Sequence, residues 1–461
     1  MLTITFLSLA GLLVLFLGFL GKSAWNQYAA VISLLLALVI MIGVNQDMLL
    51  PENLETQLDF SAGSIRFSAL ILFFSSAVLL LGKNYLSRED IQSAEFASVM
   101  IFSVVGGLML TAFTHMLTLF VGLETLGISL YILAGTDKKS AGSNESALKY
   151  LLLGAFATCL VLFGMAMIYG ATGKLDFVEI ASGSGGNLDS GLFRIGVLFL
   201  LAGILFKVSA APFHFWSPDV YEGAPNLVML FMSVVVKIAS FAALYRLFGV
   251  FFADLSDLWW TGMYYAALGS LLLGNLLALV QDSLKRQLAY SSISHTGYLL
   301  FAILVSRGGG NENGVLFYLF GYGLAMIAAF SVLLNWFPLR DNIHLKNLIG
   351  ASEKSIEGSV ILTIAFLSMA GIPLTAGFFG KLYMFSPAMK EGLYHLLVAG
   401  IVSTLVGAAY YLRPIINVWK NGQSLISEGE NLPWMAYFSA LLILMSGLFP
   451  DLIVRFFQSL G

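Results

Sequence analysis

Cysteine and charged residues are scarce in this sequence. The 461 residues include a single cysteine, Cys159, and only 11% of the residues are charged. One thiol excludes a disulfide framework and any metal or iron–sulfur site built from several cysteines. Cys159 lies in an apolar run, where we expect it to serve only for packing. The net charge of −3 and the absence of a block rich in lysine and arginine argue against nucleic acid as a partner.

Sequence motifs for nucleotides and metals are also missing. There is no phosphate-binding loop, no dinucleotide fingerprint, no HExxH and no CxxC pair. We therefore expect no flavin, haem, iron–sulfur cluster or other cofactor in this chain. The residues Asp47, Glu52, Glu55 and Asp59 make one loop acidic, and we expect this loop to be solvated rather than to bind a metal ion.

Apolar residues dominate what remains. They make up 59% of the chain and recur in continuous runs of about twenty residues, each long enough to cross a hydrocarbon core of ~30 Å as a helix. Every backbone polar group must be paired inside lipid, and the runs do not alternate as barrel strands do. The sequence therefore predicts an all-α polytopic membrane protein with about 14 spans, at 2–20, 27–45, 65–83, 94–112, 113–135, 147–170, 192–212, 225–250, 261–281, 288–306, 314–337, 357–388, 394–418 and 433–457.

Lysine and arginine are distributed unequally between the two sides of these spans. The odd-numbered connections and adjoining span ends hold thirteen of the 23 basic residues and the even-numbered ones hold seven. Because basic residues are retained in the cytoplasm, the odd-numbered connections are predicted to be cytoplasmic and both termini periplasmic. We read the first span as a retained helix, because neither a charged leader nor a small-residue cleavage site accompanies it. The remaining three basic residues, Lys207, Lys237 and Lys381, lie inside predicted spans.

Charges inside spans are the strongest functional signal of this sequence. Glu124 joins the three lysines, near the middle of the fifth predicted span. A charge at that depth costs ~2.5–3.5 kcal/mol even on the mildest insertion scale, so it is retained where it serves a function or is paired. Lys237 lies ~18 Å along its helix from Pro225, too deep for easy snorkelling to either side.

Two prolines lie close to these charges. Pro212 follows Lys207 and Pro373 precedes Lys381, and a proline cannot bond the carbonyl four residues before it. We expect the seventh span to break one turn beyond Lys207, and the twelfth near Pro373, which releases the carbonyls of Val208 and Met369. Paired broken helices in the two halves of a chain indicate the ion path of a transporter.

The spacing of the two breaks also suggests internal repeats. If each repeat has five helices and ends one span beyond its break, successive repeats have opposite orientation in the membrane. The predicted units are three N-terminal helices (1–93), a first antiporter-like repeat of helices 4–8 (94–250), a second of helices 9–13 (251–418), and a C-terminal helix 14 (419–461). Helices 7 and 12 are the discontinuous ones.

Histidines and one further lysine complete the candidate site. His295 lies in a run of serines and threonine that can relay protons, and histidine titrates near neutral pH without help. His214 lies just past Pro212 and is a weaker candidate. Lys149 begins the sixth span 25 residues after Glu124, where it either pairs with Glu124 or feeds protons inward from the cytoplasm.

Four segments of the sequence resemble the antiporter-like subunits of respiratory complex I. They are residues 121–124 (VGLE), 205–225 (LFKVSAAPFHFWSPDVYEGAP), 285–298 (KRQLAYSSISHTGY) and 371–381 (GIPLTAGFFGK). The resemblance covers nearly the whole chain, and the segment 205–225 is highly specific. It implies a proton-translocating subunit of a bacterial NADH:quinone oxidoreductase in the cell inner membrane, bound to other membrane subunits, some of them antiporter-like. NADH, FMN, iron–sulfur clusters and quinone would then be bound by partner subunits.

The resemblance also implies a role for each candidate residue. Glu124 and Lys207 would form the interacting pair of the input half-channel, Lys237 the connection, and Lys381 the terminal lysine facing the periplasmic exit. His295 would lie on the polar axis between them. Two other readings stay open: a multi-subunit cation/proton antiporter or membrane-bound hydrogenase subunit with the same motifs, and a membrane scaffold that conducts nothing.

Overall fold

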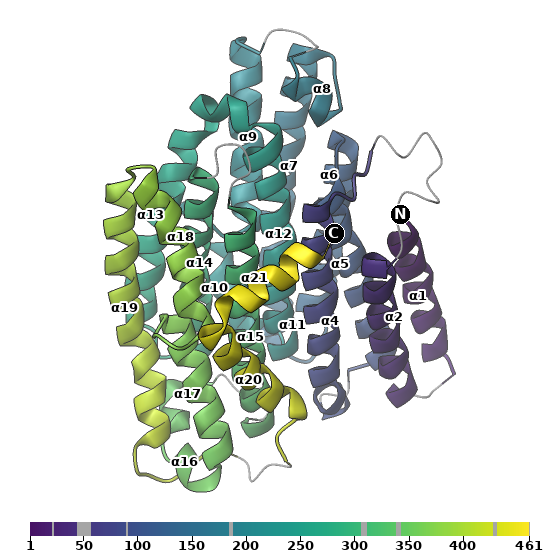
Figure 1. Ribbon diagram of the computed structural model, residues 1–461. Coiled ribbons are helices and arrows are strands. Elements are labelled where there is room, and N and C mark those ends of the chain that lie inside the picture. The colour runs from purple at the N-terminus through teal and green to yellow at the C-terminus, as the bar shows by residue number, and fades with distance from the viewer. Residues whose placement is uncertain are drawn as a thin grey trace.

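The protein is a bundle of long helices (Figure 1). The computed structural model describes residues 1–20, 23–43, 57–88, 91–183, 188–305, 311–337, 343–426 and 431–460, with only the backbone of residues 23, 24, 84, 87 and 88. The N-terminal half contains α1 (Leu2–Gly18), α2 (Ser23–Gly43), α4 (Ala62–Arg88), α5 (Ser93–Ala112), α6 (Met116–Ala134), α7 (Ala141–Thr172), α8 (Phe177–Ala181), α9 (Gly191–Lys207), α10 (Trp216–Gly223) and α11 (Asn226–Phe231). It continues with η2 (Met232–Val236), α12 (Lys237–Leu244), η3 (Tyr245–Phe251) and η4 (Ala253–Leu255).

The C-terminal half is helical as well. It contains α13 (Ser256–Leu279), α14 (Leu284–Leu304), α15 (Glu312–Trp336), η5 (Leu345–Leu348), α16 (Ala351–Lys354), α17 (Ile356–Ala370), α18 (Ala376–Lys390), α19 (Tyr394–Trp419), α20 (Trp434–Leu448) and α21 (Pro450–Ser459). Within the described residues no strand forms, and the all-α membrane fold predicted from the sequence is confirmed.

Nine described helices are long and apolar enough to cross a membrane, or ten if the bent pair α20 and α21 counts as one span. The count of fourteen spans and the two inverted repeats remain predictions. Each long helix nevertheless coincides with a predicted span to within a few residues, because the apolar runs that define the spans are the same runs that form the helices.

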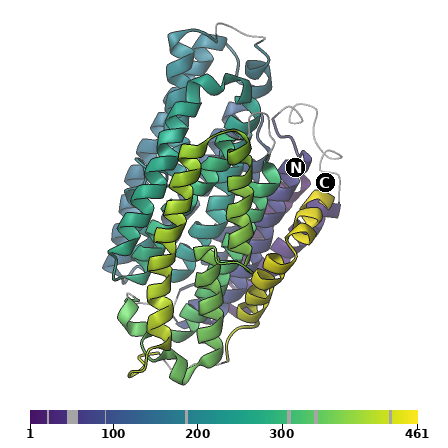
Figure 2. The same cartoon turned by 60° about the vertical axis from the view of Figure 1, so that its left-hand side comes forward.

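Neighbouring helices pack in pairs along the bundle. α5 packs on α6, α7 on α9, and α13 on α14. α1 and α2 lie at one end and α13 and α19 at the other, while α4, α12, α14 and α15 lie between them (Figures 1 and 2). The central helices are therefore shielded on all sides: the helical segment Asn226–Phe251 and α15 are buried throughout their apolar windows.

Local sequence fixes where several helices begin. Ser140, Ser190 and Ser283 precede α7, α9 and α14, and each hydroxyl oxygen accepts a hydrogen bond from a backbone N–H two or three residues into the helix. Asp176 caps α8 in the same way. These caps satisfy amide groups that a helix leaves unpaired at its start.

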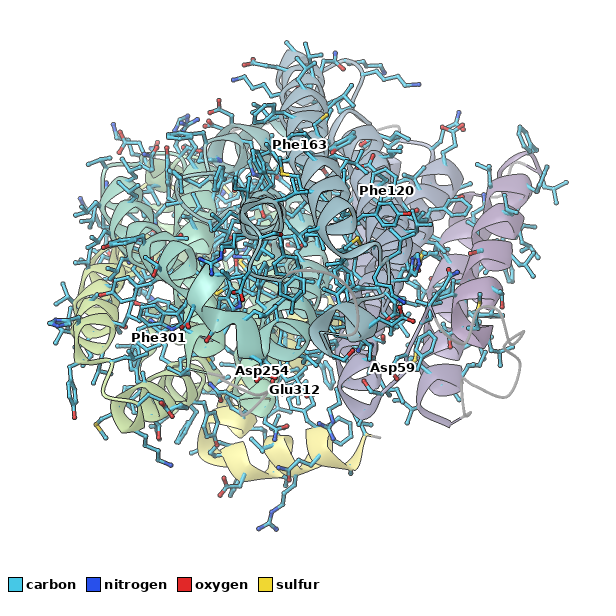
Figure 3. The ribbon with its side chains drawn as sticks, turned by 90° about the horizontal axis from the view of Figure 1, so that it is seen from above. Asp59, Phe120, Phe163, Asp254, Phe301 and Glu312 are labelled. Carbon is cyan, nitrogen blue, oxygen red and sulfur yellow. The ribbon has the colours of Figure 1, made fainter. Side chains whose placement is uncertain are left out.

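The last predicted span, 433–457, is wrong as a single helix. α20 ends at Leu448 and α21 begins at Pro450, and the two axes differ by 101°. Pro450 lacks an N–H and takes the first position of a new helix, where this group is not needed. Seen from above, α21 lies across the rim of the bundle on the side of Asp59 and Glu312, opposite Phe163 of α7 (Figure 3).

Two smaller expectations have different outcomes. The Asp59 side chain is 53% exposed, as expected of a solvated loop, and its carboxylate also pairs with Arg246 at 2.8 Å, while Asp47, Glu52 and Glu55 lie outside the described residues. Cys159 does not pack inside the protein. It is exposed on the outer side of α7, together with Phe156 and Phe163, on a face suited to lipid.

The helix that carries Lys207 is broken, but earlier than predicted. α9 ends at Lys207 itself rather than one turn later, because Ser209 adopts a left-handed backbone conformation with φ of 58°. The indole N–H of Trp216 then donates to the carbonyl of Phe206 at 3.0 Å. The carbonyls exposed by the break are thus reached by side chains from elsewhere, as irregular backbone inside a membrane requires.

The second break confirms a discontinuous helix 12. α17 ends at Ala370 and α18 begins at Ala376, with Gly371 at φ of 83° and Leu374 at φ of 71°. The left-handed region suits glycine, so Gly371 ends α17 without steric cost. At this break the carbonyls of Ala370 and Ile372 accept side-chain hydrogen bonds, from Lys381 and Thr375, whereas the prediction named the carbonyl of Met369.

A π-helical turn precedes Lys237 and was not predicted. Residues Met232–Val236 form η2, and Lys237 is the first residue of α12. A second π-helical segment, η3, follows α12. Such turns shift the side chains that follow them around the helix axis and are found frequently at functional sites.

Candidate functional site

Lys207 lies against α6 and forms no ion pair with a carboxylate among the described residues. Its amine donates to the hydroxyl of Tyr131 at 3.4 Å and lies 5.7 Å from the centre of that ring. Gly127 leaves room for the amine, since a Cβ there would lie 3.0 Å from Nζ. Lys207 is 5% exposed, so its charge is held by a hydroxyl and an aromatic face.

Glu124 lies near Lys207 but does not form an ion pair with it in the described structure. The Thr158 hydroxyl of α7 donates to the Glu124 carboxylate at 2.6 Å. Glu124 still interacts electrostatically with Lys207, so the two charges are close without touching. Glu124 and Lys207 therefore lie near each other without an ion pair, and their role as an interacting pair stays a prediction.

Lys237 is held by α14 and α15. Its amine donates to the carbonyl and the hydroxyl of Ser292, both at 2.6 Å, and to the Thr296 hydroxyl at 3.3 Å. It also lies 5.2 Å from the centre of the Tyr322 ring. The three donor positions of the ammonium group are thus used, all of them on neutral groups.

Thr296 connects the first break to Lys237. Its hydroxyl donates to the carbonyl of Val208 at 2.8 Å, the carbonyl that Pro212 was predicted to release. The same oxygen accepts from Lys237. One threonine side chain therefore joins the end of α9 to the central lysine.

His295 lies between Lys237 and Lys381. Its Nδ1 shares a hydrogen bond of 2.6 Å with Tyr318, and its Nε2 shares one of 3.0 Å with Tyr411. Both ring nitrogens are paired with hydroxyl groups, which accept a proton from one neighbour and pass one to another.

Lys381 lies at the second break. Its amine donates to the carbonyl of Ala370 at 2.8 Å and lies 5.1 Å from the centre of the Tyr298 ring. A cavity of about 10 Å³, about the room that one water molecule needs, lies between Lys381, His295 and Tyr318. The structure thus brings Lys237, His295 and Lys381 into one line of polar groups.

The predicted supporting residues separate into two places. His214 is buried at the first break with its ring stacked on Phe215, and its Nδ1 finds no hydrogen-bond partner among the described residues. Lys149 pairs with Glu145 at 2.8 Å and Asp219 at 2.7 Å. The suggested pairing of Lys149 with Glu124 is therefore wrong, because acidic residues near the helix ends are closer to Lys149.

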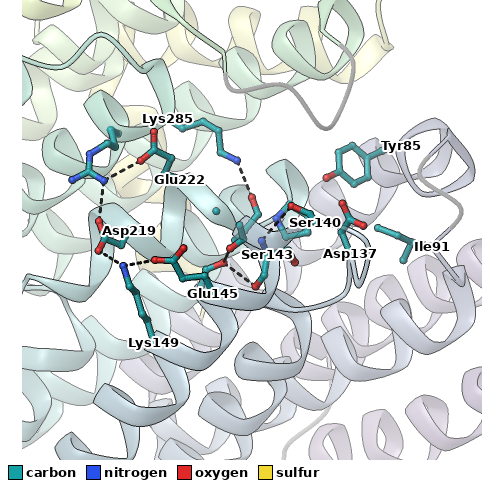
Figure 4. A pocket seen from close by; sticks show the side chains of 16 residues that line it. Tyr85, Ile91, Asp137, Ser140, Ser143, Glu145, Lys149, Asp219, Glu222 and Lys285 are labelled. Carbon is teal, nitrogen blue, oxygen red and sulfur yellow. Dashed lines mark hydrogen bonds and ion pairs between the residues drawn. The ribbon is translucent and has the colours of Figure 1, made fainter.

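Lys149 lines a large polar cavity, which we name the odd-side vestibule (Figure 4). It has a volume of about 440 Å³ and lies between the ends of α4, α7, α10 and α14, all from odd-numbered connections. Its charged lining residues are Asp137, Glu145, Lys149, Asp219, Glu222, Lys285 and Arg286.

The charges of the vestibule form a network. Arg286 pairs with Asp219 and Glu222, both at 2.9 Å, and Asp219 also pairs with Lys149. Partial burial alone would raise the pKa of Asp219, but the hydrogen bonds from Lys149 and Arg286 outweigh it and hold that pKa below its usual range. Asp219 is therefore ionised at neutral pH.

Several residues of this site were missed in the sequence. They are the tyrosine hydroxyl groups around the lysines and His295, and one buried lysine: Tyr131, Tyr298, Tyr318, Tyr322, Tyr411 and Lys285. The signal available for some of them was the polar character of 285–298, the segment that becomes α14. Among the described residues no group of three histidine, cysteine, aspartate or glutamate side chains suits a metal ion.

Comparison with known proteins identifies relatives of this chain. Residues 113–407 match the family described as NADH:quinone oxidoreductase/Mrp antiporter, TM. The chain is 38% identical over 412 residues to NADH-quinone oxidoreductase subunit N from Trichlorobacter lovleyi, which covers 86% of this chain and 82% of that protein.

Solved structures agree with the sequence comparison. A chain of respiratory complex I from Thermus thermophilus with bound aureothin has a TM-score of 0.83 and 32% identity, with 100% of each chain covered. A chain of the Mrp complex from Dietzia sp. DQ12-45-1b has a TM-score of 0.81 at 17% identity, covering 99% of this chain and 96% of that one. At such low identity the second likeness concerns the fold alone.

Proposed function

This chain belongs to the NADH:quinone oxidoreductase/Mrp antiporter transmembrane family, and we propose that it carries protons across the membrane along a line of buried residues from Glu124 to Lys381. It is an antiporter-like membrane subunit of NADH:quinone oxidoreductase and assembles with other membrane subunits of that complex. The oxidoreductase activity belongs to the complex as a whole.

One observation carries the proposal. Lys207, Lys237 and Lys381 are each 5% exposed, and none forms an ion pair with a carboxylate in the described part of the chain. A buried ammonium group without a counter-ion is costly, and the cost falls when the group releases its proton. Each lysine is therefore suited to exchange a proton with the hydroxyl groups or water beside it.

The line has a natural order. The Thr296 hydroxyl lies between the end of α9 and Lys237, while His295, Tyr318 and the small cavity lie on the way to Lys381. A proton released at Lys207 passes to Lys237, then by way of His295 to Lys381, from which it leaves toward the even-numbered connections. These roles agree with those implied by the resemblance to complex I subunits.

Glu124 controls the first step in this proposal. When its carboxylate approaches Lys207, the opposite charge favours the protonated lysine, and when it withdraws, burial favours release. The observed arrangement, with Glu124 held by Thr158 and no ion pair to Lys207, corresponds to the releasing state. A conformational change elsewhere in the complex would move Glu124 and drive the cycle.

The proposal also covers the orientation of the chain in the membrane and the location of the redox centres. The distribution of basic residues supports odd-numbered connections in the cytoplasm and both termini in the periplasm of a bacterial inner membrane. We propose that this chain holds no redox centre, and that NADH, FMN, iron–sulfur clusters and quinone are bound by partner subunits. The division into three N-terminal helices, two five-helix repeats and a last helix stays part of the proposal.

Replacement of Lys237 by methionine tests the line at its centre. The side chain keeps its apolar length but has no proton to exchange, so we expect the pumping rate of the reconstituted complex to fall by about tenfold or more. Lys174→Met is the matched control, because Lys174 pairs with Glu179 on an exposed surface. Normal pumping by the assembled Lys237→Met complex would favour the scaffold reading and end this proposal.

A further inference from the structure

We propose that Lys285 is a proton-transfer residue that carries protons from the odd-side vestibule to Lys237 without passing through Lys207. The inference rests on the proposed function, because it requires Lys237 to exchange protons. It adds a second route of uptake and a lysine that the line from Glu124 to Lys381 does not contain.

Lys285 differs from the other charged residues of the vestibule. Its side chain lines the cavity yet is 6% exposed, and among the described residues its amine donates to the carbonyl of Ala224 alone, at 2.8 Å (Figure 4). The neighbouring carboxylates of Asp219 and Glu222 are taken by Arg286 and Lys149. Among the described residues Lys285 therefore forms no ion pair, like the three lysines of the proposed line, although Glu222, which Arg286 holds, interacts with it electrostatically.

The helix that carries Lys285 also reaches Lys237. Lys285 and Ser292 are both on α14, seven residues or ~10 Å apart along the axis. Ser292 receives two hydrogen bonds from the Lys237 amine. One polar helix thus connects the vestibule with the central lysine.

Polar groups lie beside this interval on α10, which packs on α14, and at the start of α11. The Tyr221 hydroxyl faces both Ser217 and Ser292. The buried Ser217 hydroxyl lies near Tyr221 but makes no hydrogen bond of normal geometry in the described structure, and the amide oxygen of Asn226, two residues after Ala224, has no partner there either. Buried polar atoms without protein partners are places that water satisfies, and water beside Tyr221 completes a path for protons.

The surroundings of Lys207 are different. Its contacts, Tyr131 and Gly127, do not line the vestibule. The Tyr131 ring meets the ring of Tyr150 edge-on at 4.9 Å, and Tyr150 stacks on Trp216 at 4.6 Å. Aromatic rings are thus packed beside Lys207, whereas hydroxyl groups lie near Ser292 and Lys237. This difference favours proton uptake from the vestibule toward Lys237.

A purely structural role makes a different prediction. Lys285 also anchors the turn after α10 through the Ala224 carbonyl, and a cation there is favourable at the C-terminal end of a helix. Arginine fulfils that role, because it keeps the charge and donates to a carbonyl, but it does not release a proton at physiological pH. The Lys285→Arg variant therefore distinguishes a structural role of Lys285 from a role in proton transfer.

The test uses the whole complex reconstituted in vesicles, with the amount of assembled complex measured for each variant. We expect Lys285→Arg to lower the pumping rate by about tenfold, and the control Lys174→Arg, at an exposed lysine that pairs with Glu179 outside the vestibule, to pump normally. Tyr221→Phe keeps the ring and removes the hydroxyl, so its pumping should fall as well, whether or not the Lys285 variant assembles.

The outcomes distinguish this inference from the proposed function. Normal pumping by either Lys285→Arg or Tyr221→Phe overturns the route through Lys285. If Lys237→Met in the same preparation still abolishes pumping, only this route is wrong and the line from Glu124 to Lys381 stands. If Lys237→Met also pumps normally, the proposed function itself is wrong.

Discussion

Each of the two broken helices has an exposed backbone carbonyl that accepts a hydrogen bond from a side chain. The lysines at the two breaks differ in whether they supply that hydrogen bond. At the first break the exposed carbonyl of Val208 accepts from Thr296 of α14, and Lys207 turns away to Tyr131 of α6. At the second break Lys381 itself donates to the exposed carbonyl of Ala370. Lys207 is thus free to respond to a neighbouring helix, whereas Lys381 is part of the structure that holds its own break together.

This difference assigns distinct tasks to the two lysines. A lysine whose partners lie on another helix changes its environment when that helix or its Glu124 moves, which suits a switch. A lysine bonded to the backbone of its own break keeps a fixed position, which suits a terminal site that takes protons from His295. We therefore expect lysine variants at the two breaks to differ in the stability of the complex, even where they lower its pumping rate to a similar extent.

The largest expected effect comes from removing each lysine. Lys207→Met and Lys381→Met should each lower the pumping rate of the complex by about tenfold or more. Only Lys381→Met leaves a buried carbonyl without a donor, which costs about 1–3 kcal/mol. Thermal dissociation of the purified complex should therefore occur at a lower temperature for Lys381→Met than for Lys207→Met, and equal stability would contradict the distinction between the two breaks.

A smaller effect on stability and pumping is expected when the first break loses its hydrogen bond from α14. Thr296→Val keeps the shape of the side chain but removes the donor to the Val208 carbonyl, so we expect a loss of stability of about 1–3 kcal/mol. Pumping should also slow, because the hydroxyl between α9 and Lys237 is gone. Thr363→Val is the control, since Thr363 bonds only at the exposed Trp419 and within its own helix. A Thr296→Val complex with the stability of this control would show that the first break holds without α14.

The smallest effect is expected in the vestibule, away from both breaks. Asp219 has a pKa below its usual range, so its contribution to stability is present above the unfolded value of about 3.9 and is lost as pH falls through the lower folded value. The pair is partly exposed, and the contribution is at most about 1 kcal/mol. Thermal stability measured from pH 7 to pH 3 should fall slightly less steeply in Asp219→Asn than in the unaltered complex. A steeper fall in the variant would contradict the sign of this shift.

Much of the fold was predictable, because apolar runs and helix-breaking residues act locally. The long helices, the break near Pro373 and the burial of Lys207, Lys237 and Lys381 follow from the sequence. The early end of α9 did not, because it depends on the backbone of Ser209, and a left-handed serine leaves no mark in the sequence. The bend at Pro450 was missed because the apolar run continues through it.

The partners of the buried charges were harder to predict than the charges themselves. Tyr131, Tyr318 and Tyr411 come from three different helices, and their convergence on Lys207 and His295 depends on how those helices pack. Lys285 escaped notice because it lies near the start of a helix, where snorkelling is the usual explanation. Its burial and its hydrogen bond to the Ala224 carbonyl depend on tertiary packing.

Replacement of Lys207 by arginine tests most directly whether the first break is a switch. Arginine keeps a positive charge beside Tyr131 and Glu124 but does not release a proton at physiological pH. We expect an assembled Lys207→Arg complex to pump about tenfold more slowly than the unaltered complex, while Lys174→Arg pumps normally. Pumping at the normal rate by Lys207→Arg would make Lys207 a fixed counter-charge and contradict the switching mechanism.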